Sequence, residues 1–323
     1  MKDGISILGA GAFGTALAIS LARRDREVFL WARDEAHAQE MQKTRENARR
    51  LKGIKLPEGI TPTPDLRLAA LDDTILLAMP MQALGGFLER HAALLDGRRL
   101  VACCKGIDLA TGRGPAEIIA SHCPRSPVAV LTGPSFAADI ARGLPTALAL
   151  ACREEAIGKE LQEKLTTPNI RLYLGTDVLG AELGGALKNV IAIACGGVMG
   201  MGLGESARAA LMTRGYAEME RFALALGAQA ATLRGLSGFG DLVLTCTSPQ
   251  SRNYSFGEAI GRGEDFPAGV TVEGTATAEA VSALARKIGV DMPITDTVTA
   301  LLTRRITMNE AMESLLSRPL RKE

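Results

Sequence analysis

The sequence predicts an α/β fold, in which an N-terminal domain with a parallel sheet and helices on both faces is followed by an all-helical C-terminal domain. Short apolar runs alternate with helical patterns over the first half of the chain, as in strand–helix–strand units. Beyond residue 174 almost nothing resembles a strand. The 323 residues suffice for two domains, since one domain usually holds ~100–200 residues. We place the boundary near residue 180, giving domains 1–180 and 181–323.

The strands of the first domain are predicted from short apolar runs with a moderate share of β-branched residues, which is typical of strands buried on both faces. In chain order these runs are 5–9, 27–32, 74–80, 99–106, 128–134 and 146–152. Helical patterns lie between several of them, at 12–23, 34–48, 82–95 and 135–142. A last strand is expected at 170–174, "IRLYL".

Helical periodicity dominates the second domain, with loops rich in glycine and proline between the helices. The expected helices are 177–199, 205–226, 252–262, 273–289, 293–304 and 307–317.

Composition excludes several classes of protein. The chain has 37 Lys and Arg against 36 Asp and Glu, so no charge excess indicates binding to nucleic acid or to an anionic membrane. The six cysteines lack the spacing of metal ligands and are expected to be reduced core residues. The apolar run 189–204 is too short for a membrane span, which needs ~20 residues, so no stable membrane insertion is expected. We expect a cytoplasmic protein without a metal.

A glycine-rich motif opens the chain. In "ILGAGAFGTALA", Gly9, Gly11 and Gly14 have the G-x-G-x-x-G spacing between a predicted strand and a predicted helix. Such glycines permit a tight turn, close approach of a pyrophosphate, and close packing of helix on strand. The motif predicts a Rossmann-type dinucleotide site, the alternative being an ordinary strand–helix turn.

Arg33 follows the second predicted strand, in "LWARDEAH". A strict NAD binder usually has an acidic residue there, which holds the ribose 2′-hydroxyl, whereas an arginine can pair with a 2′-phosphate. The sequence therefore predicts NADP(H) as the preferred cofactor, with NAD(H) also accepted.

Lys188 is the candidate proton donor. The histidines at 37, 91 and 122 lie outside any motif and are assigned to structure or surface. Lys188 lies in "AELGGALKNVIAIACGG" (181–197), where the positions that share its helix face are mostly small: 181, 184, 185, 191, 192 and 195. A partly desolvated lysine in a groove beside a substrate suits proton transfer near pH 7. From the helix alone, a lysine that merely reaches water from a tightly packed face is equally consistent.

A second polar constellation supports a phosphate site. The segment "SGFGDLVLTCTSPQSRN" (237–253) is expected to form a loop carrying Asp241, Ser251, Arg252 and Asn253. Arg252 would supply a bidentate charge for a phosphate. Lys105, Gly133 and Ser135 follow predicted strands, at the edge where open α/β sheets bind ligands. Taken singly, each of these residues could merely stabilise a turn.

The whole chain resembles the bacterial NAD(P)-dependent glycerol-3-phosphate dehydrogenase family. The resemblance rests on "ILGAGAFGTALA", "TGPSFAADIARGLPTA", "GGALKNVIAI" and "GFGDLVLTCTSPQSRN", with "ATGRG" after "CKGIDL". It implies a Rossmann domain, a C-terminal domain like that of 6-phosphogluconate dehydrogenase, and reversible reduction of dihydroxyacetone phosphate to sn-glycerol 3-phosphate for phospholipid synthesis.

The resemblance also implies residue roles. Lys188 would be the general acid and base. The substrate would be held by Lys105, Gly133, Ser135, Lys188, Asp241, Ser251, Arg252 and Asn253. The cofactor would be contacted by Gly9, Gly11, Ala12, Phe13, Gly14, Arg33, Lys105, Ala137, Arg252 and Glu273.

Two segments depart from the family pattern. Members usually have an aromatic residue just before a Leu-Pro, where this chain has the basic "NARRLKGIKLPEG"; the basic stretch 43–55 is interpreted as a solvated helix end and loop, with a ligand role as the alternative. The loop 263–272, which leads to Glu273, is also shorter than expected.

The sequence leaves two alternative functions. A related two-domain reductase of a different small hydroxy acid is the nearer alternative, and a nucleotide-sensing protein without catalysis is the other. The apolar surface expected of the helical domain favours a homodimer.

Overall fold

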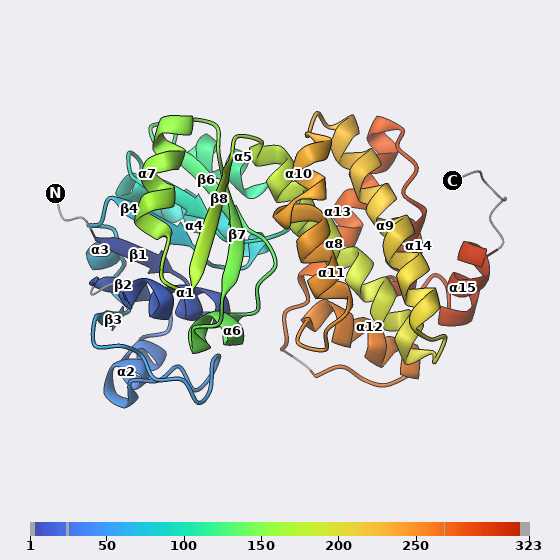
Figure 1. Cartoon of the computed structure of the whole chain (residues 1–323), viewed down its shortest axis with the longest axis horizontal. Helices are drawn as coiled ribbons and strands as arrows, with labels where there is room; N and C mark the ends of the chain where they lie inside the picture. The colour runs from blue at the N-terminus through green and yellow to red at the C-terminus, as the bar shows by residue number, and fades with distance from the viewer. Residues whose placement is uncertain (1–3, 24–25, 268, 317–323) are drawn as a thin grey trace. The chain divides into compact units, whose positions relative to one another are not determined.

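The computed structural model describes residues 4–23, 26–267 and 269–316. The chain divides into two compact units, which are described separately (Figure 1). The sheet unit comprises Met1–Lys105 and Arg113–Glu182. The helical unit comprises Gly106–Gly112 and Leu183–Glu323, so a short segment after the fifth strand belongs to it. The prediction that residues 1–180 and 181–323 are the cofactor and substrate domains remains a proposal.

The sheet unit contains a sheet of eight strands among the described residues, in the order β3-β2-β1-β4-β5-β6-β7-β8. In chain order the strands are β1 (Ile5–Leu8), β2 (Val28–Trp31), β3 (Ile60–Thr63), β4 (Thr74–Leu77), β5 (Arg99–Ala102), β6 (Val128–Thr132), β7 (Thr146–Cys152) and β8 (Ile170–Gly175). All neighbours are parallel except β6 and β7. The first six strands have the order of a doubly wound dinucleotide-binding fold, which confirms the Rossmann-type prediction.

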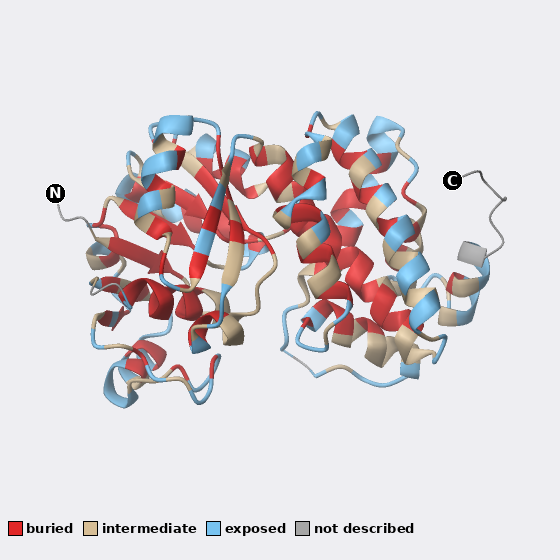
Figure 2. Ribbon diagram, in the orientation of Figure 1, coloured by how far each residue is buried: buried red, intermediate tan, exposed pale blue. Residues whose placement is uncertain are grey.

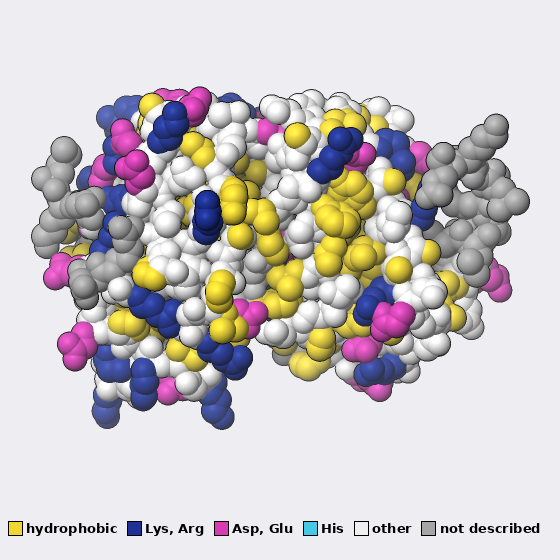
Figure 3. Space-filling model, viewed as in Figure 1, with side chains coloured by type: hydrophobic (Ala, Val, Ile, Leu, Met, Phe, Trp, Pro, Cys, Tyr) yellow, Lys and Arg dark blue, Asp and Glu magenta, His cyan; other side chains and the backbone are white. Residues whose placement is uncertain are grey.

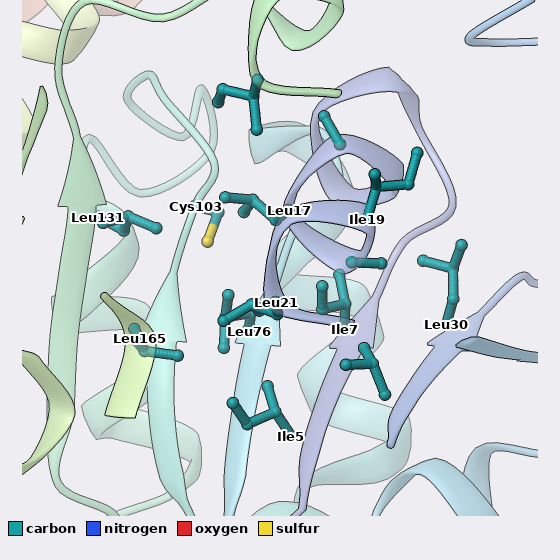
Figure 4. Packing of buried hydrophobic residues seen from close by; sticks show 14 of the residues in the cluster. Ile5, Ile7, Leu17, Ile19, Leu21, Leu30, Leu76, Cys103, Leu131 and Leu165 are labelled. Atoms are coloured by element: carbon teal, nitrogen blue, oxygen red, sulfur yellow. The ribbon is translucent and has the colours of Figure 1, made fainter. Parts of the chain in front are cut away.

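The pleat of the strands sends alternate side chains to opposite faces of the sheet. Ile5 and Ile7 of β1 belong to one core cluster and Leu8 to another. Helix α1 (Ala12–Ala22) packs into the first cluster and is buried from Gly14 to Ala22, as Figure 4 shows for Leu17 beside Cys103 and Leu21 beside Leu76. Its largely apolar sequence, with only Thr15 and Ser20 polar, follows from this burial on nearly all sides.

The other helices of the sheet unit connect its strands. They are α2 (Glu35–Thr44), α3 (Leu66–Ala69), α4 (Met81–Leu95), α5 (Pro115–His122), α6 (Ala137–Arg142) and α7 (Glu155–Leu165). Three features were not predicted from sequence. Strand β3, "ITPT", contains a proline and lies at the sheet edge, where proline is tolerated. Helices α3, α5 and α7 were missed, and the direction of β7 relative to β6 was not foreseen.

The described part of the helical unit contains helices and loops but no strand, which confirms the predicted all-helical C-terminal domain. Its elements are α8 (Val178–Gly200, which begins in the sheet unit), α9 (Glu205–Ala225), α10 (Ala230–Arg234), the π-helix η1 (Leu236–Gly240), α11 (Asp241–Cys246), α12 (Arg252–Arg262), α13 (Glu273–Ile288), α14 (Pro293–Leu302) and α15 (Met308–Leu316). The end of the predicted helix 307–317, residue 317, lies outside the described residues.

Helix α8 is the central helix of this unit. Its length and its mean hydropathy of 1.5 would suffice to cross a membrane, but 83% of its most apolar window is buried inside the protein (Figure 2). Glycines let α12 approach it closely: a Cβ at Gly196 would lie 2.0 Å from the oxygen of Tyr254, and one at Gly257 2.0 Å from the oxygen of Ile193. The small-residue run therefore serves backbone packing between α8 and α12.

Candidate active site

The glycine-rich turn has the geometry of a dinucleotide cradle. Gly9 adopts φ +126°, and a Cβ there would lie 2.5 Å from the oxygen of Ala78. A Cβ on Gly14 would lie 2.1 Å from the oxygen of Gly9, so glycine lets α1 start tightly against the turn. Gly11, by contrast, has no atom within 4 Å of its Cβ position. Its backbone therefore faces open space at the N-terminus of α1, where N–H groups and the helix dipole favour an anion.

The adjoining cofactor candidates lie at the same end of the sheet. Ala12 and Phe13 are the first residues of α1, which follows β1, and Arg33 follows β2. Because β1 and β2 are parallel neighbours, their carboxyl ends adjoin. Arg33 is exposed, and the next residue, Asp34, caps α2 by accepting the backbone N–H of His37 at 2.8 Å.

A second group follows β5 and β6. Lys105 Nζ lies 3.4 Å from the oxygen of Gly133, and Ser135 Oγ donates to the same oxygen at 3.2 Å. Gly133 has φ +130°, and its Cβ position lies 3.3 Å from Cα of Leu148, so a side chain there would be strained as well as crowded. Ala137 begins α6. The structure thus brings Lys105, Gly133 and Ser135 together.

Lys188 lies in a buried polar cluster of the helical unit. Its ammonium donates to Oδ1 of Asp241 and to Oγ1 of Thr245, each at 2.7 Å. Oγ1 of Thr245 in turn donates to the backbone oxygen of Asp241 at 2.6 Å, which turns its lone pairs to the lysine. All three residues are at most 6% exposed. A buried charge is tolerated only when it is paired and hydrogen-bonded. Asp241 and Thr245 together meet this requirement for the Lys188 ammonium.

A chain of amides positions the neighbouring candidates. Nδ2 of Asn253 donates to Oδ1 of Asn189 at 2.9 Å, and Oδ1 of Asn253 accepts the N–H of Gly274 at 2.9 Å. Asn253 therefore joins α8, α12 and the start of α13, where Glu273 is the first residue. Ser251 is the N-cap of α12 and accepts the N–H of Tyr254 at 3.2 Å.

Two sequence predictions about this cluster need correction. The segment 237–253 is not a loop: η1 and α11 occupy most of it, and α12 begins at Arg252. The small face of α8 is not an open groove at Gly184, because a Cβ there would lie 2.5 Å from the oxygen of Ser237. The glycines that suggested a loop instead let η1 pack directly on α8.

Sequence reasoning missed Thr245 and Asn189 as candidate residues. Thr245 lies four residues after Asp241, so the two share one face of α11. That spacing could have been recognised had the segment been predicted as helical. Asn189 follows Lys188 directly, but its partner on α12 is distant in sequence.

Two further titratable groups near these elements have raised pKa values. Burial raises the pKa of the Cys246 thiol well above its ordinary value, so it stays protonated. Burial also raises the pKa of Glu182 to about 7, although the N–H of Ala116, 2.6 Å from Oε1, opposes the rise. No disulfide joins the six cysteines, all of which are described and buried. The described residues contain no group of three or more His, Cys, Asp or Glu side chains that could hold a metal.

Comparison with known proteins identifies the family. Residues 4–158 match the model of the NAD-dependent glycerol-3-phosphate dehydrogenase N-terminus, and residues 177–313 match that of the C-terminus. The chain belongs to the NAD-dependent glycerol-3-phosphate dehydrogenase family. It is accordingly an NAD(P)-dependent oxidoreductase, as the resemblance implied.

Relatives of this dehydrogenase cover nearly its full length. Proteins named glycerol-3-phosphate dehydrogenase (NAD(P)+) from Cereibacter sphaeroides and a Ruegeria species are 61% and 58% identical over 319 residues, covering 99% of this chain and 100% and 99% of theirs. The crystal structure of glycerol-3-phosphate dehydrogenase from Coxiella burnetii has a TM-score of 0.94 at 40% identity, and covers 98% of this chain and 99% of that one.

Proposed function

We propose that this dehydrogenase reversibly reduces dihydroxyacetone phosphate to sn-glycerol 3-phosphate and thereby supplies the backbone of glycerophospholipids. The observation that carries the proposal is the buried Lys188–Asp241–Thr245 cluster, in a segment that matches the family. A carbonyl reduction needs a group that protonates the oxygen as hydride arrives at carbon.

The geometry around Lys188 supports a role in proton transfer. The Asp241 carboxylate accepts a hydrogen bond from Nζ of Lys188 at 2.7 Å, so the proton-bearing nitrogen is held by a charge-assisted hydrogen bond. In reduction Lys188 gives a proton to the substrate oxygen at C2, and in oxidation it takes that proton back. Asp241 and Thr245 hold the nitrogen between two acceptors. Lys188 is therefore already ordered before the reaction, and reaching the transition state costs little further conformational entropy at this side chain.

The substrate phosphate is assigned to Arg252, whose guanidinium can bind it through two parallel hydrogen bonds. Arg252 is the first residue of α12, next to the cap Ser251. Asn253 would orient the substrate hydroxyls, together with Asn189, to which it is bonded. Lys105, Gly133 and Ser135 complete the proposed substrate set.

The proposed cofactor set is built on the glycine-rich turn. When bound, the nicotinamide supplies the hydride. Gly9, Gly11 and Gly14 fit a pyrophosphate, since a Cβ at two of them would strike backbone and the third faces open space. The remaining contacts are assigned to Ala12, Phe13, Arg33, Lys105, Ala137, Arg252 and Glu273.

We assign NADP(H) as the preferred form because Arg33 is exposed where a 2′-phosphate would lie. In Arg33→Asp, affinity for NADPH should fall strongly while affinity for NADH is kept or improved. An unchanged ratio of the two affinities would refute the assignment.

We further propose a cytoplasmic homodimer. Hydrophobic side chains gather on the visible face of the helical unit (Figure 3), and large exposed ones include Leu203, Leu224 and Phe239. A second copy of the chain would remove such side chains from water.

The function is tested with purified protein and dihydroxyacetone phosphate, following NADPH and NADH oxidation separately by absorbance. Turnover is expected with this substrate. Folded protein that binds dinucleotide but oxidises neither cofactor would contradict the proposal, and a panel of phosphorylated and unphosphorylated keto acids would then test the reductase alternative.

A further inference from the structure

The basic stretch 43–55 has no part in the residue roles assigned above. After α2 ends at Thr44, Arg45 adopts a left-handed conformation with φ 53°. A tight turn then starts at Asn47, whose backbone oxygen accepts the N–H groups of Arg50 and Leu51 at 3.1 and 2.7 Å. The stretch is therefore an ordered turn.

Asn47 anchors this turn to the glycine-rich turn. Its side chain is fully buried, and Nδ2 donates to the backbone oxygen of Ala10 at 3.0 Å and to Oγ1 of Thr15 at 2.7 Å. Since both amide hydrogens are used, Oδ1 accepts, and His37 Nε2, 2.9 Å away, must carry a hydrogen. Leu51, also buried, ties the other end of the turn to the core of the sheet unit.

The anchored turn places Arg49 next to Asp34, the residue that follows Arg33 in the sequence. Nη1 of Arg49 lies 3.6 Å from Oδ2 of Asp34, and Nε lies 2.7 Å from Oε2 of Glu40. The Arg49 side chain remains 45% exposed. Hydrogen bonding from His37 N–H, with a smaller contribution from the Arg49 charge, holds the pKa of Asp34 below its ordinary value, so Asp34 is anionic at neutral pH.

This arrangement resolves an electrostatic conflict after β2. An anionic Asp34 directly after Arg33 would repel a phosphate that Arg33 attracts. Arg49 offsets that charge and adds a second guanidinium, which suits a dianionic phosphate better than one arginine does.

We propose that Arg49 is a second specificity-determining residue, which with Arg33 binds the 2′-phosphate of NADP(H). The inference rests on the proposed preference for NADP(H). It gives the basic stretch a ligand role, which was the alternative interpretation of its sequence.

The test measures binding of nucleotide fragments and needs no turnover. Calorimetric titration compares 2′,5′-ADP with ADP, which lacks the 2′-phosphate. In Arg49→Ala the dissociation constant for 2′,5′-ADP should rise at least about tenfold, the loss of a charge-assisted hydrogen bond, while that for ADP is unchanged. Arg50→Ala is the matched control from the same turn and should change neither constant.

Other outcomes separate the two proposals. Equal weakening of both ligands in Arg49→Ala, or no weakening, overturns the role of Arg49. If in addition Arg33→Ala alone removes the selectivity, the NADP(H) preference stands without Arg49. A wild-type protein that binds both ligands equally would overturn both the preference and the role of Arg49, whatever substrate the enzyme reduces.

Discussion

Lys188 shows what a residue pattern can and cannot predict. Its candidacy followed from its isolation among small residues, and the structure gives it two hydrogen-bond partners. Those partners lie 53 and 57 positions away, on a segment that the sequence suggested was a loop. Local periodicity carries no information on such long-range pairing: the family resemblance suggested that Asp241 orients the lysine, whereas Thr245 was not anticipated.

Replacing Lys188 tests its role directly. Lys188→Ala should lower kcat by at least about two decades, the usual contribution of general acid catalysis, while cofactor binding is retained. The single variant also strands the buried carboxylate of Asp241, so Lys188→Ala with Asp241→Asn serves as a control for stability. Steady-state kinetics and calorimetric binding of NADPH provide the readouts, and near wild-type kcat would refute the role.

Thr245 offers a subtler test of the same cluster. Thr245→Val keeps the shape but removes the oxygen that accepts from Lys188, so kcat should fall by roughly tenfold with little change in KM. Thr245→Ser should restore most of the activity because it restores the oxygen. If the serine variant is as slow as the valine variant, packing rather than the hydroxyl explains the loss.

Glu182 predicts a pH dependence of stability. Its pKa in the folded protein, about 7, lies above the ordinary value of 4.5 because burial disfavours the charged form. Its contribution to stability is therefore full below about pH 4.5 and is lost as the pH rises through 7. Between pH 4.5 and 7, the free energy of unfolding of Glu182→Gln should rise by about 1–3 kcal/mol relative to that of wild type. Above pH 7 the difference between the two proteins should stay constant. Urea unfolding at a series of pH values measures this, and a difference that does not vary with pH would contradict it.

At the scale of elements, strong periodicity and burial made the long segments predictable. Helix α8 was predicted at 177–199 and found at Val178–Gly200. Elements set by packing were missed or misjudged: η1 and α11 were expected to be a loop, whereas Gly184 and Gly238 let backbones lie in close contact around η1, with a Gly238 Cβ position 2.0 Å from the oxygen of Leu233. In a sequence, glycine indicates a flexible backbone and so suggests a loop. The structure shows instead that these glycines are required because the backbones lie too close together for a side chain.

Glycine-to-alanine substitutions can distinguish a glycine that is needed for close packing from one that is not. Gly257→Ala should destabilise the protein by about 1–3 kcal/mol, because its Cβ would meet the backbone of α8. Gly85→Ala, in α4 with no atom within 4 Å of the Cβ position, should be neutral or stabilise by up to about 1 kcal/mol. Chemical denaturation of both variants measures the contrast, and equal effects would show that the contact between α8 and α12 relaxes freely.

At the scale of the whole molecule, the proposed homodimer predicts a solution mass near twice the chain mass of 34.0 kDa. Light scattering on a gel-filtration column measures it, and a mass equal to one chain at micromolar concentration would refute the dimer. The strand–helix alternation predicted a parallel sheet, but it predicted neither β3 nor the order of the strands. The reversed direction of β7 was not predicted either, because apolar runs do not encode strand direction.

The segment Gly106–Gly112 limits how modular this enzyme can be. It belongs to the helical unit although the residues on both sides of it belong to the sheet unit, so the chain passes between the units three times. A gene divided at Glu182 would leave these seven residues on the wrong fragment. Neither unit is encoded by one uninterrupted stretch, and exchange of a whole unit between relatives requires two joined replacements rather than one.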